Sequence, residues 1–349
     1  MEKIPLEIMV KIFKYLSSEE RYLSRRVSSQ FMQVFKASIM VDKFTLERKN
    51  IDFYGMRALS GATNLELPFC TKITNKSLAF IEGVRSIDLT GCEKITNKGL
   101  VFLKGVEKVS IAGCKYVTDS GLKYLKDCEE VVLAGCERIT DKGLKNLNKT
   151  KTLSLCWCDQ ITDTGLAYLV GIKELFLTGV NFTNEGLRHL TSLKKISLAN
   201  SDQVTDESLA FLSGVKSVCL SNCYGITDEG LSHLERVENV NISDCLQITD
   251  EGLGHLERVE NVNISGCSQI TDEGLVHLRL VKRLDLSSCF ITDVGLSYLE
   301  CVEDLNVSNC EFITSVGLSG LKEARKIDIS GCTEVYNMEP VPGQEIIKS

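Results

Sequence analysis

One stretch of about 22 residues recurs many times along the chain, and this repetition limits the possible folds more than any other feature. Two adjacent copies show it best: V-E-N-V-N-I-S-D-C-L-Q-I-T-D-E-G-L-G-H-L-E-R from Val237, and V-E-N-V-N-I-S-G-C-S-Q-I-T-D-E-G-L-V-H-L from Val259. A period of roughly 20–29 residues is typical of a solenoid, in which successive coils stack on one continuous core. We therefore expect an elongated repeat protein.

Each repeat has two halves with different periodicities. The first half alternates apolar and polar residues, which predicts a strand, and the second has the three- and four-residue spacing of a helix. Between them lies Ile-Thr-Asp or a close variant, with Thr present in all twelve repeats from Thr74 to Thr314. This Thr is placed to cap the following helix, and the acid suits the positive helix end. The pattern predicts a right-handed α/β solenoid with parallel strands on its concave face and short helices on its convex face.

Cysteines mark the register of the repeat. Eleven of the fifteen cysteines occupy one position, which Val180 and Ser201 fill in two repeats. We call this position the cysteine ladder; its cysteines are Cys70, Cys92, Cys114, Cys136, Cys158, Cys223, Cys245, Cys267, Cys289, Cys310 and Cys332. Because Val180 and Ser201 need no partner thiol, we expect small buried residues here rather than disulfides or zinc ligands. Cys156-Trp157-Cys158 also lacks the spacing of a zinc pair.

Composition and charge narrow the class of protein. The chain has 349 residues, ordinary hydrophobic content (43%) and only four prolines, which argues against wholesale disorder. The net charge is −7; residues 1–40 carry +3, so the remainder carries −10 and shows no continuous basic stripe. We expect no nucleic-acid partner. No apolar run is long enough for a membrane span, and the N-terminus lacks the features of a secretory signal, so we expect a cytoplasmic or nuclear protein.

Repeated polar residues raise the question of catalysis or metal binding. The four histidines, at positions 189, 233, 255 and 277, share one repeat position and suit either a metal row or a duplicated surface residue. No thiol or carboxylate joins each histidine at ligand spacing, which favours the surface residue. The recurring Asp follows from the recurring turn, and no phosphate loop or nucleophile motif occurs. We expect no enzyme activity, no cofactor and no metal.

The two ends of the chain depart from the repeat. Residues 1–36 have helical spacing and more apolar residues than so short a segment can bury, which suits either a partner surface or a cap on the solenoid. Residues 37–61 suit a degenerate capping repeat, residues 62–332 hold the regular repeats of 21–22 residues, and residues 333–349 form a tail that we expect to fray.

Both parts of the chain resemble known motifs. The unit Cys-x-x-Ile-Thr-Asp-x-Gly-Leu-x-x-Leu resembles the cysteine-containing class of leucine-rich repeat over about 270 residues. The N-terminal I-P-L-E-I-M-V-K-I-F-K-Y-L, followed by Val27-Ser28-Ser29-Gln30-Phe31, resembles an F-box, although Ile4 replaces the usual Leu. Together they resemble the F-box and leucine-rich repeat proteins, which are substrate receptors of cullin-based ubiquitin ligases. The repeats here are shorter than is common in animal relatives, so we expect brief convex helices.

The resemblance implies two binding surfaces. The F-box would bind a Skp-type adaptor, and through it a cullin, while the repeats bind the protein to be ubiquitinated; apart from that complex we expect a monomer. The adaptor-binding residues would be Pro5, Leu6, Glu7, Ile8, Ile12, Phe13, Leu16, Val27 and Phe31. The alternative is a leucine-rich repeat scaffold or inhibitor without a ligase role, whose N-terminal helices serve only as a cap.

The outward strand positions predict where the target protein binds. They lie six, four and two residues before the cysteine-ladder position. In the last repeats these positions are Asn, Asp and Ser, which predicts a polar and partly acidic surface. In the middle repeats they include large or apolar residues, and we expect Phe176 to be exposed beside the buried Leu175 and Leu177. The predicted partner-binding residues are Val132, Cys156, Trp157, Phe176, Cys219, Asp285 and Asp304.

Overall fold

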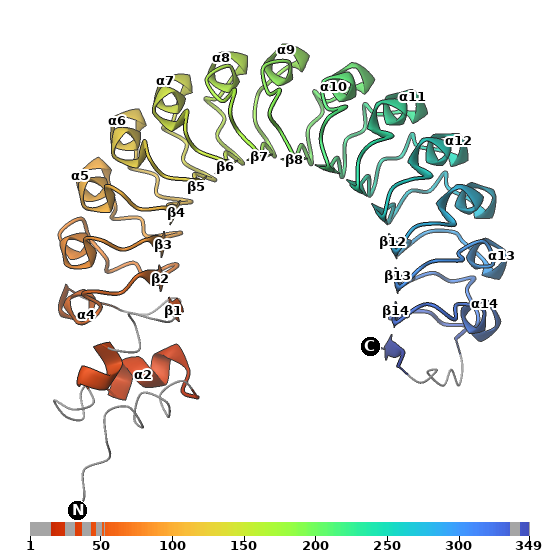
Figure 1. The fold of residues 1–349 in the computed structure, drawn as a ribbon, viewed down its shortest axis with the longest axis horizontal. Coiled ribbons are helices and arrows are strands. Elements are labelled where there is room, and N and C mark those ends of the chain that lie inside the picture. Colours follow the sequence, from red (N-terminus) through yellow and green to blue (C-terminus); the bar gives the residue numbers. More distant parts are fainter. Residues whose placement is uncertain are drawn as a thin grey trace, which may run out of the picture. The chain divides into compact units, whose positions relative to one another are not determined.

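The computed structural model describes residues 15–24, 32–36, 43–46, 51, 53–335 and 343–348. The chain divides into two compact units, Met1–Ile172 and Lys173–Ser349. Within each unit, short parallel strands line one face and short helical turns line the opposite face (Figure 1). We call these faces the strand face and the helix face.

The described residues of the first unit form six strands, and consecutive strands pair in parallel. The strands are β1 (Lys43–Thr45), β2 (Asn64–Glu66), β3 (Ser86–Asp88), β4 (Lys108–Ser110), β5 (Glu130–Val132) and β6 (Thr152–Ser154). The helical turns are α2 (Ser18–Ser24), α4 (Phe53–Ala58), η1 (Ser77–Ile81), α5 (Asn97–Leu100), η2 (Val101–Leu103), α6 (Asp119–Leu122), η3 (Lys123–Leu125), α7 (Asp141–Leu144), η4 (Lys145–Leu147) and α8 (Asp163–Leu166).

In the part of the second unit that the structure describes, nine strands follow one another in the same parallel order. They are β7 (Glu174–Phe176), β8 (Lys195–Ser197), β9 (Ser217–Cys219), β10 (Asn239–Asn241), β11 (Asn261–Asn263), β12 (Arg283–Asp285), β13 (Asp304–Asn306), β14 (Lys326–Asp328) and β15 (Glu345–Ile347). The helical turns are α9 (Asn184–Leu187), α10 (Asp206–Ala210), α11 (Asp228–Leu231), η5 (Ser232–Leu234), α12 (Asp250–Leu253), η6 (Gly254–Leu256), η7 (Asp272–Leu278), α13 (Asp293–Leu296) and α14 (Ser315–Ser319).

The core of each coil follows from its sequence pattern. In β11 the middle residue Val262 is 3% exposed, while Asn261 and Asn263 on either side face outward and are half-buried. Helix residues such as Leu253 and Leu256 close the core from the other side and are fully buried. Each coil buries several aliphatic side chains at ~1.5–3 kcal/mol each, which is too little to order 22 residues alone, so neighbouring coils stabilise one another.

The Thr-Asp turn joins neighbouring coils as well as starting a helix. As predicted, Thr140 caps its helix, because its hydroxyl accepts a hydrogen bond from the backbone nitrogen of Lys142 at 3.3 Å. In addition, Asp119 of the preceding coil accepts from both the backbone nitrogen and the hydroxyl of Thr140, at 2.7 Å each. The same Asp–Thr bridge recurs at Asp141–Thr162, Asp206–Thr227, Asp228–Thr249, Asp250–Thr271, Asp272–Thr292 and Asp293–Thr314.

The ladder cysteines are buried as expected, except for the half-buried Cys332, and no disulfide links any of the fifteen thiols. Each ladder thiol donates a hydrogen bond to the carbonyl of the residue that directly follows the strand of the preceding coil; Cys245, for example, lies 3.2 Å from the oxygen of Leu220. Burial raises the pKa of most of these thiols, to about 12 for Cys92 and Cys267. The ladder therefore closes each coil against the previous one with a small neutral side chain.

The structure describes parts of both ends of the chain. Ser17 caps α2: its hydroxyl accepts from the backbone nitrogen of Glu20, and the Glu20 carboxylate accepts from the backbone nitrogen of Ser17 at 2.8 Å. Phe44, which lies within the predicted capping repeat, is fully buried in β1. The expectation that the tail frays is wrong for Glu345–Ile347, which pair with β14 because the tail carries one more short run of strand-forming residues.

Candidate partner-binding surface

A shallow groove of about 350 Å³ lies on the strand face of the second unit. We call it the Asn groove, because asparagines from β10, β11 and β13 supply much of its lining. Its residues are Ser217, Val218, Cys219, Asn239, Val240, Asn241, Asn261, Val262, Asn263, Arg283, Leu284, Asp285, Asp304 and Asn306. Three of the predicted partner-binding residues, Cys219, Asp285 and Asp304, thus lie in one groove.

The outward residues six positions before the cysteine ladder form a row across the strands. Arg283 belongs to this row, and its contact determines how the asparagine amides in the row are oriented. Its guanidinium can only donate, and Nη1 lies 3.1 Å from the amide oxygen of Asn261. The amide nitrogen of Asn261 therefore points the other way and donates to the amide oxygen of Asn239 at 2.6 Å. Both oxygens in this chain of contacts have a donor, so the remaining amide nitrogen of Asn239 is left as a hydrogen-bond donor.

A second row consists of the residues four positions before the cysteine ladder, and hydrogen bonds from the backbone determine how its asparagine amides are oriented. Asn241 accepts from the backbone nitrogen of Ser243 and Asn263 from that of Ser265, both at 2.9 Å. A backbone nitrogen can only donate, so each asparagine must present its amide oxygen inward. The amide nitrogens are therefore the groups that these asparagines have available for a partner.

Asp285 is engaged within the sheet. One carboxylate oxygen accepts from the backbone nitrogen and hydroxyl of Ser287, at 2.9 and 2.7 Å, and the other accepts from the amide nitrogen of Asn306 at 3.1 Å. Asp328 accepts from the backbone nitrogen of Ser330 in the same way. The sequence correctly placed these acids on the strand face, but their contacts fit a turn-stabilising role, since much of their hydrogen-bonding capacity is already used.

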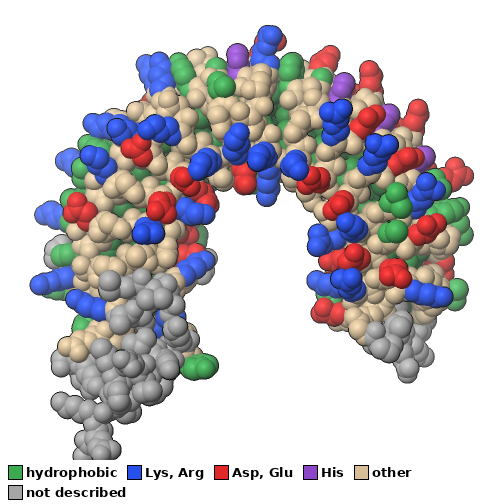
Figure 2. Space-filling view, in the orientation of Figure 1, with side chains coloured by type: hydrophobic (Ala, Val, Ile, Leu, Met, Phe, Trp, Pro, Cys, Tyr) green, Lys and Arg blue, Asp and Glu red, His purple; other side chains and the backbone are tan. Residues whose placement is uncertain are grey.

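Lysines gather at the edge of the strand face beside the groove, and basic side chains stand out there in Figure 2. The position seven residues before the ladder mostly alternates in charge, with pairs such as Glu260–Lys282 at 3.0 Å. At the start of the second unit, however, three lysines follow one another, and Lys195 lies beside them on β8. Lys216 is paired with Glu238, and Lys173 contacts the carbonyl of Ser192 at 3.4 Å. We call Lys173, Lys194, Lys195 and Lys216 the basic edge.

Phe176 faces outward between the buried Leu175 and Leu177, as expected. The expectation that its ring is exposed is wrong: Phe176 is half-buried. The ammonium group of Lys195 lies 5.6 Å from the ring centroid, and the apolar stem of this lysine can cover part of the ring. Phe176 therefore provides an apolar contact next to the basic edge.

Trp157, in the first unit, has an unusual backbone conformation. It lies immediately before the ladder residue Cys158, where the other coils, except the one with Phe69, place glycine, asparagine, aspartate or serine. Its φ is +60°, in the left-handed region, and its side chain is 58% exposed. A bulky residue in this region is strained, and such strain is concentrated at functional sites. Phe69 shares the conformation, but its ring packs over Gly91, where an added Cβ would lie 2.5 Å from Phe69 Cδ1.

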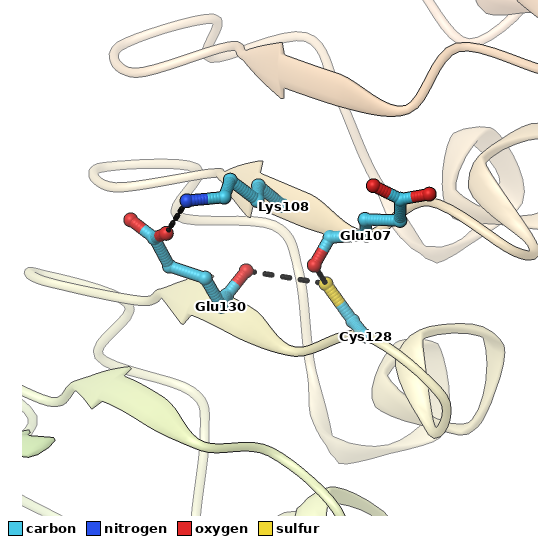
Figure 3. Close-up of polar contacts among 4 residues, drawn as sticks. All are labelled: Glu107, Lys108, Cys128 and Glu130. Carbon is cyan, nitrogen blue, oxygen red and sulfur yellow. Dashed lines mark hydrogen bonds and ion pairs between the residues drawn. The ribbon is translucent and has the colours of Figure 1, made fainter. Parts of the chain in front are cut away.

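The other predicted partner-binding residues of the first unit, Val132 and Cys156, face outward and are half-buried. Val132 lines a shallow depression with Ser110 of β4 and Glu130 of β5. Figure 3 shows how this region is held: Lys108 donates to Glu130 at 2.6 Å, and the thiol of Cys128 lies 3.1 Å from the carbonyl oxygens of both Glu107 and Glu130. On the strand face of the first unit, a salt bridge thus links neighbouring strands.

The predicted adaptor surface falls almost wholly outside the described residues. These positions are Pro5, Leu6, Glu7, Ile8, Ile12, Phe13, Val27 and Phe31. Leu16 is described and is half-buried. Nearby, α2 contacts β1, and the rings of Tyr22, Phe35 and Phe44 pack edge to face. The helical segment is therefore connected to the first coil by aromatic packing.

Metal binding finds no support in the part of the chain that the structure describes. No cluster of three or more His, Cys, Asp or Glu side chains within it has ligand geometry. His277 instead contacts Glu257 at 3.1 Å on the helix face. Within the same residues, no helix is long and apolar enough to cross a membrane.

Comparison with known proteins agrees with this architecture. A family model described as a leucine-rich repeat matches residues 84–104, 277–299 and 298–322. A chain of the yeast Rad7–Elc1 complex aligns with a TM-score of 0.59 and 17% identity over 98% of this chain and 91% of that one. An internalin from Listeria monocytogenes aligns with a TM-score of 0.53 and 17% identity, over 95% and 93% of the two chains.

A leucine-rich-repeat protein of Leptospira interrogans aligns with a TM-score of 0.51 and 15% identity, over 91% of this chain and 92% of that one. A search of curated protein sequences finds no match. The chain contains leucine-rich repeats and has the fold of an α/β leucine-rich-repeat solenoid. Its repeats provide a protein-interaction scaffold.

Proposed function

We propose that the chain is the substrate-recognition subunit of a cullin-type ubiquitin ligase. The F-box-like stretch from Ile4 to Phe31 would bind a Skp-type adaptor, and the strand face of the repeats would bind the target protein. The observation that carries the proposal is the position of this stretch, directly before leucine-rich repeats of the cysteine-containing type. The chain would hold the target protein close to a separate transferase, which carries out the chemical step.

Three further observations support the proposal. Within the F-box-like segment, Ser18–Ser24 form the helix α2, with a capping box at Ser17. The strand face carries outward polar side chains around an open groove. A structurally similar chain comes from a complex of two proteins, Rad7 and Elc1, in yeast.

Co-purification with a Skp-type adaptor tests the adaptor surface. The full chain should retain the adaptor, and a chain lacking residues 1–36 should lose it. A matched test replaces two apolar residues, Leu6→Ala with Phe13→Ala. Since helix-in-groove contacts depend on a few buried anchors, this double variant should lose the adaptor while its repeats unfold at the same temperature as the parent's. Full adaptor retention by both variants would leave the alternative, a repeat scaffold or inhibitor without a ligase role.

A further inference from the structure

The basic edge and the Asn groove form one surface within the second unit. Register pairs Lys195 of β8 with Ser217 of β9, and continues through Asn239, Asn261 and Arg283 on the next three strands. These five strands span ~19 Å at ~4.8 Å per step. Lysines flank one end of this row and Arg283 the other, so a positive charge stands at each end.

The hydrogen-bonding groups of this surface are mostly donors. The side-chain oxygens of Asn239, Asn241, Asn261 and Asn263 already accept from neighbouring groups of the protein, as shown above. The ammonium and guanidinium groups of Lys194, Lys195 and Arg283 have no acceptor capacity at all. These groups favour a partner that brings acceptors: carboxylates at the ends of the row and amide or main-chain carbonyls along it.

We propose that this surface binds an extended acidic segment of the target protein, lying across β8–β12 from Lys195 to Arg283. The proposal rests on the proposed function in taking the strand face as the target-binding surface, and it adds the chemistry of the target. About six extended residues cover ~19 Å. The half-buried Asp304 follows Arg283 in register and repels further acids, which limits the segment to this length.

Several features favour a peptide over a nucleic acid. Within the second unit the run of lysines covers only three coils, where Glu174 lies on β7 and Glu238 pairs with Lys216; Lys151, which precedes the run in the sequence, is paired with Glu129. A nucleic-acid strand carries a phosphate at every nucleotide and needs a longer basic track. The ring of Phe176 beside Lys195 instead suits an apolar residue within an acidic segment.

Fluorescence anisotropy with the purified full-length chain tests the proposal. The probe is a fluorescein-labelled decapeptide of alternating Glu and Ala, compared with a twin in which every Glu is Gln. We expect the Glu peptide to bind about tenfold more tightly, with an advantage that shrinks at high salt. The double variant Lys194→Glu with Lys195→Glu should lower its affinity about tenfold or more, because like charges then face the peptide.

The matched control is Lys326→Glu, which makes the charge change of one of these two substitutions in the row of Lys195 but on β14, beyond the groove. It should leave the affinity within about twofold, since the charge lies farther than a Debye length from the basic edge. Equal binding of the Glu and Gln peptides, or equal losses in all the lysine variants, would overturn the proposal. Tighter binding of a ten-nucleotide single-stranded DNA at the same lysines would also overturn it.

The adaptor assay separates this proposal from the proposed function. Peptide binding uses the chain without any adaptor. Loss of the adaptor with retained peptide binding would reject the ligase role and keep the acidic-segment surface. Retained adaptor binding with no preference for the Glu peptide would reject the surface and keep the ligase role.

Discussion

Asp119 on α6 accepts two hydrogen bonds from Thr140, which begins the helix of the next coil, at 2.7 Å from both the backbone nitrogen and the hydroxyl. One carboxylate thus satisfies a helix-start donor in its neighbour, besides lying at the positive end of its own helix. Because the contact recurs along the chain, it is a direct polar link between coils in addition to the parallel strand bonds.

Replacing Asp119 tests how much this link contributes. Asp119→Ala leaves the Thr140 backbone donor without its acceptor, and we expect a loss of ~1–3 kcal/mol in the free energy of unfolding. Asp119→Asn should cost less, because Asn97 occupies the equivalent position in α5, accepts from the Thr118 nitrogen at 2.9 Å and donates to its hydroxyl at 2.7 Å. Urea unfolding of the three proteins measures the difference. Equal losses for the two variants would show that charge, not the paired hydrogen bonds, matters here.

The glycine of the same turn has a steric role. A Cβ on Gly143 would lie 2.5 Å from Asp119 Oδ1 and 3.0 Å from Leu122 Cδ1. Since Asp119 is held by Thr140, it cannot move aside freely, and Gly143→Ala should destabilise the chain by ~1–3 kcal/mol. Gly171→Ala is the control, because its Cβ would meet only one backbone oxygen at 3.9 Å. The prediction fails if the two alanine variants unfold at the same urea concentration.

The sequence predicts the coil because the coil depends on local periodicity. Alternation placed Val262 in the core and its neighbours Asn261 and Asn263 outside, and the recurring Thr predicted helix caps that the structure contains. The Asp119–Thr140 bridge was not predicted, since it joins residues 21 positions apart whose closeness depends on how coils stack. The recurrence of Thr-Asp-x-Gly in seven of the twelve repeats was the available signal, because an incidental surface acid would not require a glycine nearby.

The candidate site was predicted only in outline. Sequence alternation assigned Asp285 to the strand face, but an outward position does not tell whether a carboxylate is already hydrogen-bonded, as this one is by Ser287 and Asn306. The basic edge was missed because three of its four lysines, all except Lys195, lie seven residues before the ladder, outside the strand positions considered. Comparing the residue seven positions before the ladder across all repeats reveals the basic edge, because in the other repeats the charge at this position mostly alternates in sign.

The cysteine ladder makes a prediction about thiol reactivity. Burial raises the pKa of Cys92 and Cys267 to about 12, so these thiols stay neutral and shielded at pH 8, whereas Cys301 is exposed. Brief iodoacetamide treatment of the folded chain should modify Cys301 first and leave the ladder intact. After denaturation without reductant, all fifteen thiols should react. Peptide mass mapping checks both results, and ladder thiols that react natively as fast as Cys301 would contradict the buried assignment.

The same pKa shifts give a pH dependence. An unfolded thiol ionises near its ordinary value of 9.0, while the folded thiol of Cys267 resists ionisation up to about 12. The unfolded state therefore loses protons first, and stability, fully present below pH 9, falls as the pH rises from about 9 toward 12. Urea midpoints at pH 8 and 10 test this. Replacing two ladder residues, Cys245→Ala with Cys267→Ala, should reduce the drop between the two pH values; an unchanged drop would assign it to other groups.

A substitution at Trp157 best separates an effect on folding stability from an effect on target binding. Its left-handed backbone is costly for a tryptophan and is adopted by asparagine in three other coils, at Asn200, Asn222 and Asn309. Trp157→Asn relieves that strain by ~1 kcal/mol. Because the ring is exposed, little packing is lost with it, and we expect no large fall in the free energy of unfolding. If the ring is an anchor for the target protein, the same variant should weaken target binding by ~2 kcal/mol or more, roughly thirtyfold.

Phe69→Asn is the matched control, because Phe69 has the same conformation but its ring covers Gly91. That variant should lose stability, since it uncovers a neighbouring coil, and should keep the target. Quantitative mass spectrometry of proteins co-purified with each tagged chain, alongside urea unfolding, gives both readouts. A Trp157→Asn chain that is clearly destabilised yet holds the same proteins at the same level would make the tryptophan a packing residue. The strained aromatic would then serve the solenoid, and target binding would have to depend on other parts of the strand face, where the basic edge and Asn groove are the best-supported candidates.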